Sequence, residues 1–254
     1  NKINFLMGHK VGITISHILM YIITNETNKQ IEFNSKPFFI TQYVNTSQKN
    51  IIMVRNPKEI IISGYLYHKK CGNNDKWALH KYGLYYNLES IKQLENNNLP
   101  PDLKKICLQY FKESTKFSIP IPYQDKLNNL NLIEGIKKEM NSVAYQTIHG
   151  MYNLKNIDNE NVFILKFEDL IYNHDNTIKK LCQFLNIKNS ITENIIKKSL
   201  NHNLIHLKNN NKILRHSTNK SVKKNRYLDY WNNELEEEFN KLFPKDVMKK
   251  FGYE

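Results

Sequence analysis

The stretch NIIMVRNPKEIIISGYLYH, residues 50–68, predicts a strand that turns directly into a helix. Its first part, Ile51–Arg55, is an apolar run with three β-branched residues, typical of a strand buried on both faces of a parallel sheet. Asn56 is a favoured helix N-cap, and Pro57 is preset for the first helical position. At such a turn, free backbone N–H groups and the positive end of the helix dipole face outward together. Because Arg55 adds a planar five-donor fork, the stretch predicts a binding site for an anion such as phosphate.

The arginine at this turn is unusual for the composition of the chain. Only three of the 37 lysines and arginines are arginine, namely Arg55, Arg215 and Arg226. The positive charge is therefore supplied almost wholly by lysine. Where lysine is so dominant, a retained arginine indicates a task that a point charge does not perform, such as bidentate binding of phosphate.

A second anion-binding turn is predicted near the start of the chain. The apolar run INFLM at 3–7 reads as a strand, GHKVG at 8–12 as a glycine-flanked loop, and 13–23 has the apolar spacing of a helix. Lys10 lies inside this loop, and Thr14 lies in the first helical turn. The order of residues differs from a nucleotide-hydrolysing P-loop, whose lysine directly follows the last glycine.

Together the two turns resemble those of the sulfotransferases that use 3′-phosphoadenosine 5′-phosphosulfate (PAPS). The family's first loop has the form P-K-x-G-T-T, and the matching places are held here by His9, Lys10, Val11, Gly12, Ile13 and Thr14. The family's second motif is R-N-P-x-[DE] with a serine eight residues after the arginine, matched by Arg55, Asn56, Pro57, Glu59 and Ser63. The resemblance implies that the first loop binds the 5′-phosphosulfate end, and that Arg55 and Ser63 bind the 3′-phosphate.

Three later segments extend the resemblance. In NVFILKFED, residues 161–169, Phe167 takes the place of a family tyrosine that contacts adenine. Leu204 takes the place of an aromatic residue that stacks on adenine. The basic segment 215–226 lacks the glycines of the family's 3′-phosphate loop, and Arg215 and Lys220 are its two candidates for the loop arginine.

The resemblance assigns catalysis to Lys10, which would stabilise the departing 5′-phosphate, and leaves the general base open. Cytosolic members carry a histidine in a Thr-His pair, but the corresponding pair here is Thr41-Gln42, and glutamine does not act as a base. Some carbohydrate sulfotransferases use a glutamate instead, and Glu32 is the candidate at that spacing. A solvated loop residue is the alternative interpretation of Glu32. His68 and His149 are further candidates for the base.

A short strand end offers two more carboxylates, Glu168 and Asp169. At the start of a helix, such residues commonly accept hydrogen bonds from backbone N–H groups. We therefore expect a structural role for both of them.

The predicted fold is α/β: a central parallel sheet flanked by helices, the P-loop-like sulfotransferase fold, in one domain over residues 1–254. Pro37–Val44 is a candidate third strand, and 69–125 reads as a variable lid or acceptor region rich in aromatic residues. Helix-like spacing runs from Leu132 to Leu154, and Asn232–Phe251 predicts a closing pair of helices.

Composition limits the function classes. The net charge of +13 favours polyanionic ligands such as PAPS, with a small-molecule or glycan acceptor. We expect no membrane span, because the apolar runs are short, and no metal site, because metal-ligand spacing is absent. We also expect no nucleic-acid partner. The three cysteines fit a reducing compartment, so we expect a cytoplasmic protein, or a protein of the Golgi lumen if an N-terminal anchor has been removed. The oligomeric state is not predicted.

Two other function classes stay open at this point. A kinase-like P-loop protein would use a similar phosphate cradle, although a Walker lysine and a magnesium-binding carboxylate are not found. A non-catalytic basic module that binds polyanions would need only the lysine-rich surface.

Overall fold

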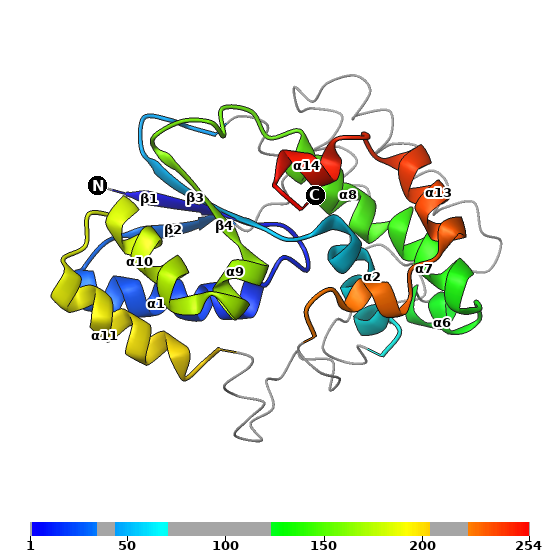
Figure 1. The fold of residues 1–254 in the computed structure, drawn as a ribbon, viewed down its shortest axis with the longest axis horizontal. Coiled ribbons are helices and arrows are strands. Elements are labelled where there is room, and N and C mark those ends of the chain that lie inside the picture. The colour runs from blue at the N-terminus through cyan, green and yellow to red at the C-terminus, as the bar shows by residue number, and fades with distance from the viewer. Residues whose placement is uncertain (1, 35–43, 71–122, 204–222, 254) are drawn as a thin grey trace. The chain divides into compact units, whose positions relative to one another are not determined.

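A computed structural model describes residues 2–34, 44–70, 123–203 and 223–253, and these contain a four-stranded parallel sheet (Figure 1). The strand order is β2-β1-β3-β4. The strands are β1 (Ile3–Leu6), β2 (Ile31–Asn34), β3 (Lys49–Val54) and β4 (Val162–Lys166). Since every pairing is parallel, the carboxyl ends of all four strands lie at one edge of the sheet. The predicted α/β class with a central parallel sheet is confirmed.

Strand β3 lies inside the sheet and is buried from Asn50 to Val54. Its register brings Ile51 beside Phe5 of β1 and beside Phe163 of β4. A strand covered on both faces needs apolar side chains in both directions, which explains the continuous run read from the sequence. The strand ends at Val54, one residue before the predicted end, so Arg55 opens the turn.

The helices follow the strands in the order that the sequence suggests. In the described parts of the chain, the α-helices are α1 (Ile13–Thr27), α2 (Pro57–His68), α6 (Tyr123–Asn128), α7 (Leu132–Met140), α8 (Val143–Tyr152), α9 (Phe167–Tyr172), α10 (His174–Phe184), α11 (Asn189–Leu200), α13 (Asn233–Leu242) and α14 (Val247–Lys250). A 3₁₀ turn, η3 (Arg226–Asp229), precedes α13. The predicted helical stretch from Leu132 to Leu154 is divided into α7 and α8, and the closing pair is confirmed as α13 and α14.

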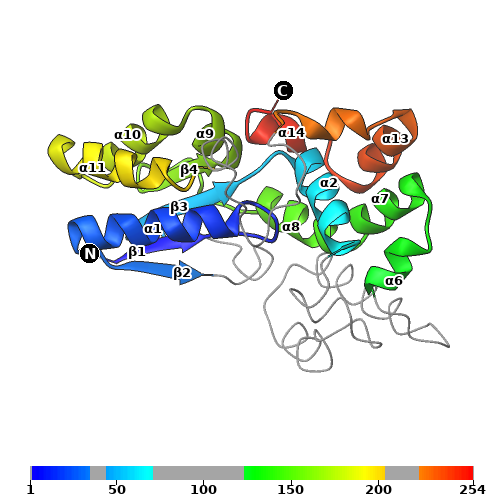
Figure 2. The same ribbon diagram turned by 90° about the horizontal axis from the view of Figure 1, so that it is seen from below.

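Helices α1, α10 and α11 pack together on one face of the sheet (Figures 1 and 2). Buried Ile178 and Leu181 of α10 and Ile195 of α11 lie at helical spacing, so each helix turns one apolar stripe inward. The layer contains α1, which follows β1, and α10, which comes after β4 and α9.

Strand β2 was not predicted. It has four residues, Ile31–Asn34, and its only apolar residues are Ile31 and Phe33. An alternation of two apolar positions is too short to predict a strand. The candidate strand at 37–44 lies mostly outside the described residues, and Val44, which is described, is not in a strand.

The described residues group into two compact units. One contains 1–60, 147–231 and 243–254, and the other contains 61–146 and 232–242. The sheet and the three strand-to-helix junctions discussed below belong to the first unit. The single domain over 1–254 stays a prediction, and so does the lid or acceptor region at 69–125, because residues 71–122 lie outside the described part of the chain.

Candidate active site

Three strand-to-helix junctions lie at the carboxyl edge of the sheet. They follow β1, β3 and β4: the first is the loop 7–12, the second is Arg55–Asn56, and at the third β4 runs directly into α9, which begins with Phe167 and Glu168. Ligands of open parallel sheets bind at this edge, where neighbouring connections leave in opposite directions. Here β1 continues to β2 on one side, whereas β3 leads to β4 on the other.

The loop after β1 has the backbone of a tight anion-binding turn. Lys10 has φ 61° and Gly12 has φ 109°, both in the left-handed region. A Cβ on Gly12 would lie 2.4 Å from Cδ2 of Phe167, so only glycine fits between the loop and that ring. Because glycine has no side chain to cap α1, no side-chain hydrogen bond from the N-cap residue occupies the N–H groups of the first helical turn. These groups suit an anion.

Arg55 contacts the other two junctions. Its Nη1 donates a hydrogen bond to the Lys10 carbonyl at 2.9 Å, and its guanidinium carbon lies 4.5 Å from the centre of the Phe167 ring. Its Nη2 lies 3.5 Å from a carboxylate oxygen of Glu59. Within the described residues its Nε has no hydrogen-bond partner. The guanidinium is therefore fixed in one orientation while part of its donor set is unused.

The electrostatics around Arg55 involve two carboxylates. Burial lowers the pKa of Arg55, and the negative charges of Glu59 and Glu168 raise it. Its side chain is 12% exposed. The two carboxylates thus compensate part of the hydration that the buried guanidinium loses.

Asn56 and Glu168 fix the turn itself. The Asn56 side chain accepts hydrogen bonds from the N–H groups of Lys58 (2.9 Å) and Glu59 (3.4 Å), which confirms the predicted N-cap. The Asn56 N–H donates to Glu168 at 3.1 Å, and the Tyr253 hydroxyl donates to the second oxygen of Glu168 at 2.9 Å. Burial raises the pKa of Glu168. As expected, Glu168 binds a backbone N–H group, although that group belongs to the turn before α2.

Glu59 is a site residue to which sequence reasoning gave no role of its own. It is 5% exposed, and one of its oxygens accepts the backbone N–H of Tyr227 at 2.8 Å. The other oxygen faces Arg55. The family motif marked its position but not this contact, because Tyr227 lies 168 residues further along the chain.

The remaining predicted residues divide into three groups. His9, Val11, Ile13 and Thr14 lie on the first loop or in the first turn of α1, and Val11 is fully buried. Ser63 lies within α2, one helical turn after Glu59. Leu204, Arg215 and Lys220, like the Thr41-Gln42 pair, lie outside the described residues.

Glu32 is not among the residues that the structure brings together at this edge. It lies on β2, beside Asn4 in the register, and its carboxylate is 3.7 Å from the ammonium of Lys2. Its side chain is 62% exposed. The loop position considered for it is therefore wrong, because the segment pairs with β1 as an edge strand.

The two histidines named as further candidates for the base have different surroundings. His68 is fully buried, with Nδ1 2.9 Å from Glu139, and the same carboxylate oxygen accepts the Tyr123 hydroxyl at 2.7 Å. A histidine enclosed in this way does not reach an acceptor. The His149 ring packs beside Phe243, with ring centres 5.3 Å apart.

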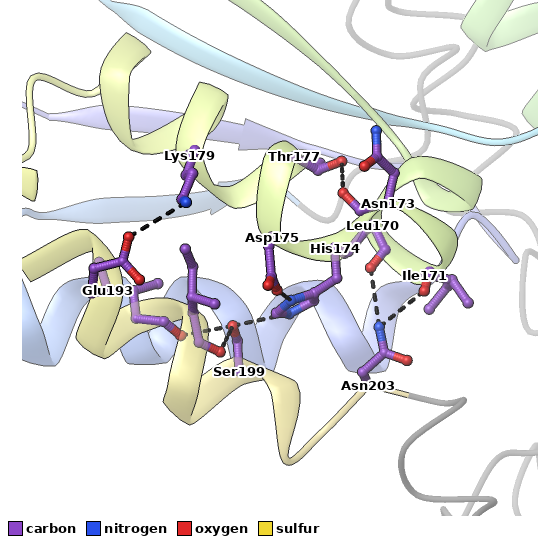
Figure 3. Close-up of polar contacts among 12 residues, drawn as sticks. Leu170, Ile171, Asn173, His174, Asp175, Thr177, Lys179, Glu193, Ser199 and Asn203 are labelled. Atoms are coloured by element: carbon purple, nitrogen blue, oxygen red, sulfur yellow. Dashed lines mark hydrogen bonds and ion pairs between the residues drawn. The ribbon is translucent and has the colours of Figure 1, made fainter.

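A Ser-His-Asp arrangement between α10 and α11 resembles a hydrolytic triad (Figure 3). His174 lies 3.1 Å from the Ser199 hydroxyl and 2.8 Å from Asp175. However, Ser199 is buried in the last turn of α11 and donates to the Ile195 carbonyl at 2.7 Å. A nucleophile needs an exposed hydroxyl and an oxyanion site, so this cluster is a structural link between two helices.

Within 2–34, 44–70, 123–203 and 223–253, no group of three or more His, Cys, Asp or Glu side chains is arranged to hold a metal ion. In the same part of the chain, none of the helices combines the length and the apolar character that a membrane crossing requires.

The fold is an α/β fold, and at the carboxyl edge of its sheet lie the guanidinium of Arg55 and the backbone N–H groups at the start of α1. A family model described as the sulfotransferase domain matches residues 14–252. The chain therefore belongs to the sulfotransferase family, and we conclude that it is an enzyme of that family. This assignment decides against the kinase-like and non-catalytic alternatives. The match begins at Thr14, directly after the left-handed turn of the first loop.

A solved structure agrees with the fold. The crystal structure of mouse sulfotransferase SULT7A1 complexed with PAP is similar, with a TM-score of 0.50 and 14% sequence identity. The similarity covers 98% of this chain and 84% of that chain. At this identity the likeness concerns the fold alone. No curated protein matched the chain.

Proposed function

We propose that the protein transfers the sulfuryl group of PAPS to a hydroxyl or an amine of a small-molecule or glycan acceptor. The observation that carries this proposal is the position of Arg55, which is bonded to the Lys10 carbonyl and stacked on Phe167. One guanidinium thus connects the two motifs that the sequence assigns to the two phosphate ends of PAPS. PAPS supplies an activated sulfuryl group on its 5′-phosphate.

The first loop would bind the 5′-phosphate. In the transfer, the bond between sulfur and the phosphate oxygen breaks, a bond between sulfur and the acceptor atom forms, and the acceptor loses its proton. Negative charge then develops on the departing phosphate. The ammonium of Lys10 and the N–H groups at the start of α1 are suited to stabilise this charge. No metal is needed for this role, because a lysine and a helix N-terminus supply positive charge.

The second motif would bind the 3′-phosphate. Arg55 offers a planar donor group held by three contacts, and Ser63 follows on the same helix with a hydroxyl. Phe167 would contact the adenine, as the resemblance implies. Leu204, Arg215 and Lys220 complete the proposed set on sequence grounds alone.

The proton acceptor is proposed by exclusion among the candidates. His68 is enclosed, and Glu32 is paired with Lys2 on the edge strand. We therefore propose that neither acts as the base. Either His149 takes the proton of the acceptor, or the acceptor ionises by itself. The second route favours acceptors that lose a proton readily.

Calorimetry tests the proposed cofactor directly. Adenosine 3′,5′-bisphosphate and ADP carry similar charge but differ in the 3′-phosphate. We expect tight binding of the bisphosphate and weak binding of ADP, because only the first ligand carries the group assigned to Arg55. A preference for ADP, or equal binding of both, would contradict the proposal. A screen of alcohols, phenols, amines and glycans with radiolabelled PAPS would then identify the acceptor class.

A further inference from the structure

Tyr253, which follows α14, is packed against the junction of β4 and α9. Its hydroxyl donates a hydrogen bond to Oε2 of Glu168 at 2.9 Å, and its backbone N–H donates to the Met248 carbonyl at 3.0 Å. The ammonium of Lys166 lies 5.0 Å from the centre of its ring and donates to the Gly252 carbonyl at 3.1 Å. Because Lys166 contacts the ring and Glu168 binds the hydroxyl, the position of this side chain is well defined.

The same carboxylate binds the turn before α2 with its other oxygen. Oε1 of Glu168 accepts the backbone N–H of Asn56 at 3.1 Å. Asn56 directly follows Arg55, and Glu168 directly follows Phe167, whose ring stacks on the Arg55 guanidinium. Two hydrogen bonds through Glu168 therefore link Tyr253 to the turn that carries the arginine proposed for the 3′-phosphate.

The carboxylate of Glu168 has an alternative partner in the Arg55 guanidinium. Burial lowers the pKa of Arg55 and raises that of Glu168, and in each case the opposite charge of the other residue acts against this shift. The two groups are therefore close enough to attract each other. A carboxylate that paired with the guanidinium would occupy donors that a phosphate uses. In the structure, the two oxygens of Glu168 are engaged by Asn56 and Tyr253 instead.

The Tyr253 hydroxyl is suited to hold this carboxylate at neutral pH. Burial raises the pKa of Tyr253 well above the usual value, and the negative charge of Glu168 raises it further. The hydroxyl therefore stays protonated and remains a donor. Phenylalanine at this position would keep the ring beside Lys166 but would leave Oε2 of Glu168 without this donor.

We propose that Tyr253 is a positioning residue of the nucleotide site: its hydroxyl holds the Glu168 carboxylate on the Asn56 turn and so prevents it from competing with the 3′-phosphate for Arg55. This inference rests on the function proposed above. It gives a role in nucleotide binding to a residue that need not touch the nucleotide.

The first test is Tyr253→Phe, measured by calorimetry with adenosine 3′,5′-bisphosphate and with 5′-AMP, which differ only in the 3′-phosphate. We expect affinity for the bisphosphate to fall roughly 10-fold, because a charged hydrogen bond from Glu168 to Arg55 then competes with the ligand. Affinity for 5′-AMP should change less than about threefold. Tyr152→Phe is the matched control, because it removes a hydrogen bond of 2.8 Å from a tyrosine to Asp246, the residue before α14, and leaves Glu168 unchanged. It should leave both affinities within about threefold of the parent.

The second test, Glu168→Gln, distinguishes competition from simple support of the fold. The glutamine keeps an oxygen for the Asn56 N–H but has no negative charge with which to compete for Arg55. We expect the single variant to bind the bisphosphate at least as tightly as the parent. The double variant Tyr253→Phe/Glu168→Gln should bind it within about threefold of Glu168→Gln, because the loss of the hydroxyl matters only while the carboxylate is charged.

The outcomes separate the inference from the proposed function. If the double variant binds the bisphosphate more weakly than Tyr253→Phe, or if Tyr253→Phe weakens both ligands equally or neither of them, Tyr253 does not position the site and the inference is wrong. Thermal unfolding shows whether each variant is folded. If Tyr253→Phe is not, Glu168→Gln alone decides, because a loss of bisphosphate affinity in that variant contradicts competition. If the unmodified protein fails to prefer the bisphosphate over 5′-AMP, the proposed function is wrong and the inference falls with it.

Discussion

The Arg55 site and the Ser199–His174 link are two polar clusters of the same compact unit. They differ in whether their hydrogen-bonding groups all have partners within the described residues. In the link, the Ser199 hydroxyl bonds to carbonyls of its own helix, and His174 lies between Ser199 and Asp175 (Figure 3). At the Arg55 site, the guanidinium bonds to a loop carbonyl and stacks on a ring. One of its nitrogens has no partner among the described residues.

The difference shows which arrangement is suited to a ligand. A cluster whose donors and acceptors satisfy one another gains nothing from a further polar group, and its contribution is to stability. A guanidinium held in one orientation, and helical N–H groups without a side-chain cap, gain hydrogen bonds when an anion binds. Catalytic-looking residue types alone do not make this distinction, because serine, histidine and aspartate occur in the structural cluster.

The largest expected effect comes from removing the lysine of the anion-binding loop. Lys10→Ala should lower kcat by about two orders of magnitude or more, because the lysine meets charge that develops on the leaving phosphate. Affinity for PAPS should change less. Steady-state kinetics with PAPS and a screened acceptor measure both quantities. A pure rise in KM would make Lys10 a uniform binding contact, and unchanged kinetics would remove it from the site.

The next effect concerns the rigid guanidinium. Arg55→Lys keeps the charge but loses the planar fork, so affinity for adenosine 3′,5′-bisphosphate should fall by roughly 1–3 kcal/mol. Ser63→Ala should cost about 1 kcal/mol. Calorimetry provides both numbers, with Lys241→Gln, which removes an exposed charge from α13, as the control for general charge. If both variants bind as tightly as the parent protein, the 3′-phosphate site lies elsewhere.

The structural cluster should respond in the opposite way. Ser199→Ala removes the bond to the Ile195 carbonyl and the contact with His174, so the free energy of unfolding should fall by about 1 kcal/mol. Once the protein is folded, kcat and KM should match those of the parent. Denaturant unfolding and kinetics at a temperature well below the transition measure these effects. A large loss of kcat with normal stability would give the cluster a chemical role.

The smallest expected effect concerns Glu32. Because its carboxylate is exposed on the edge strand beside Lys2, Glu32→Gln should leave both kcat and PAPS affinity within about twofold of the parent. The same kinetic assay measures this. A loss of rate with affinity kept would show that Glu32 is the base after all, and that the edge strand approaches the reacting atoms during catalysis.

The sequence was informative where local pattern and local chemistry agree. The β3 run, the Asn56 cap and the helix after Pro57 were all predicted, because each depends on residues within a few positions of one another. The glycine loop after β1 was predicted for the same reason. The fold class followed from strands that alternate with helices.

The parts that sequence did not predict depend on distant partners. Strand β2 was missed because only two apolar residues mark it, and its pairing with β1 decides its conformation. The contact between Glu59 and Tyr227 joins α2 to η3 across 168 residues of sequence. No local pattern records such a return.

The start of α2 shows one consequence of these long-range contacts. Asn56 and Glu59 have the spacing of a capping box, in which the glutamate bonds back to the N–H of the cap residue. Here that N–H is bonded to Glu168, and Glu59 is turned towards Arg55 and Tyr227. A peptide of residues 50–68 lacks Glu168, so its helix would begin with the ordinary reciprocal box. The native orientation of Glu59 therefore depends on α9 and η3 as well as on its own helix, so a change at Glu168 or at the start of η3 would also alter the surroundings of Arg55.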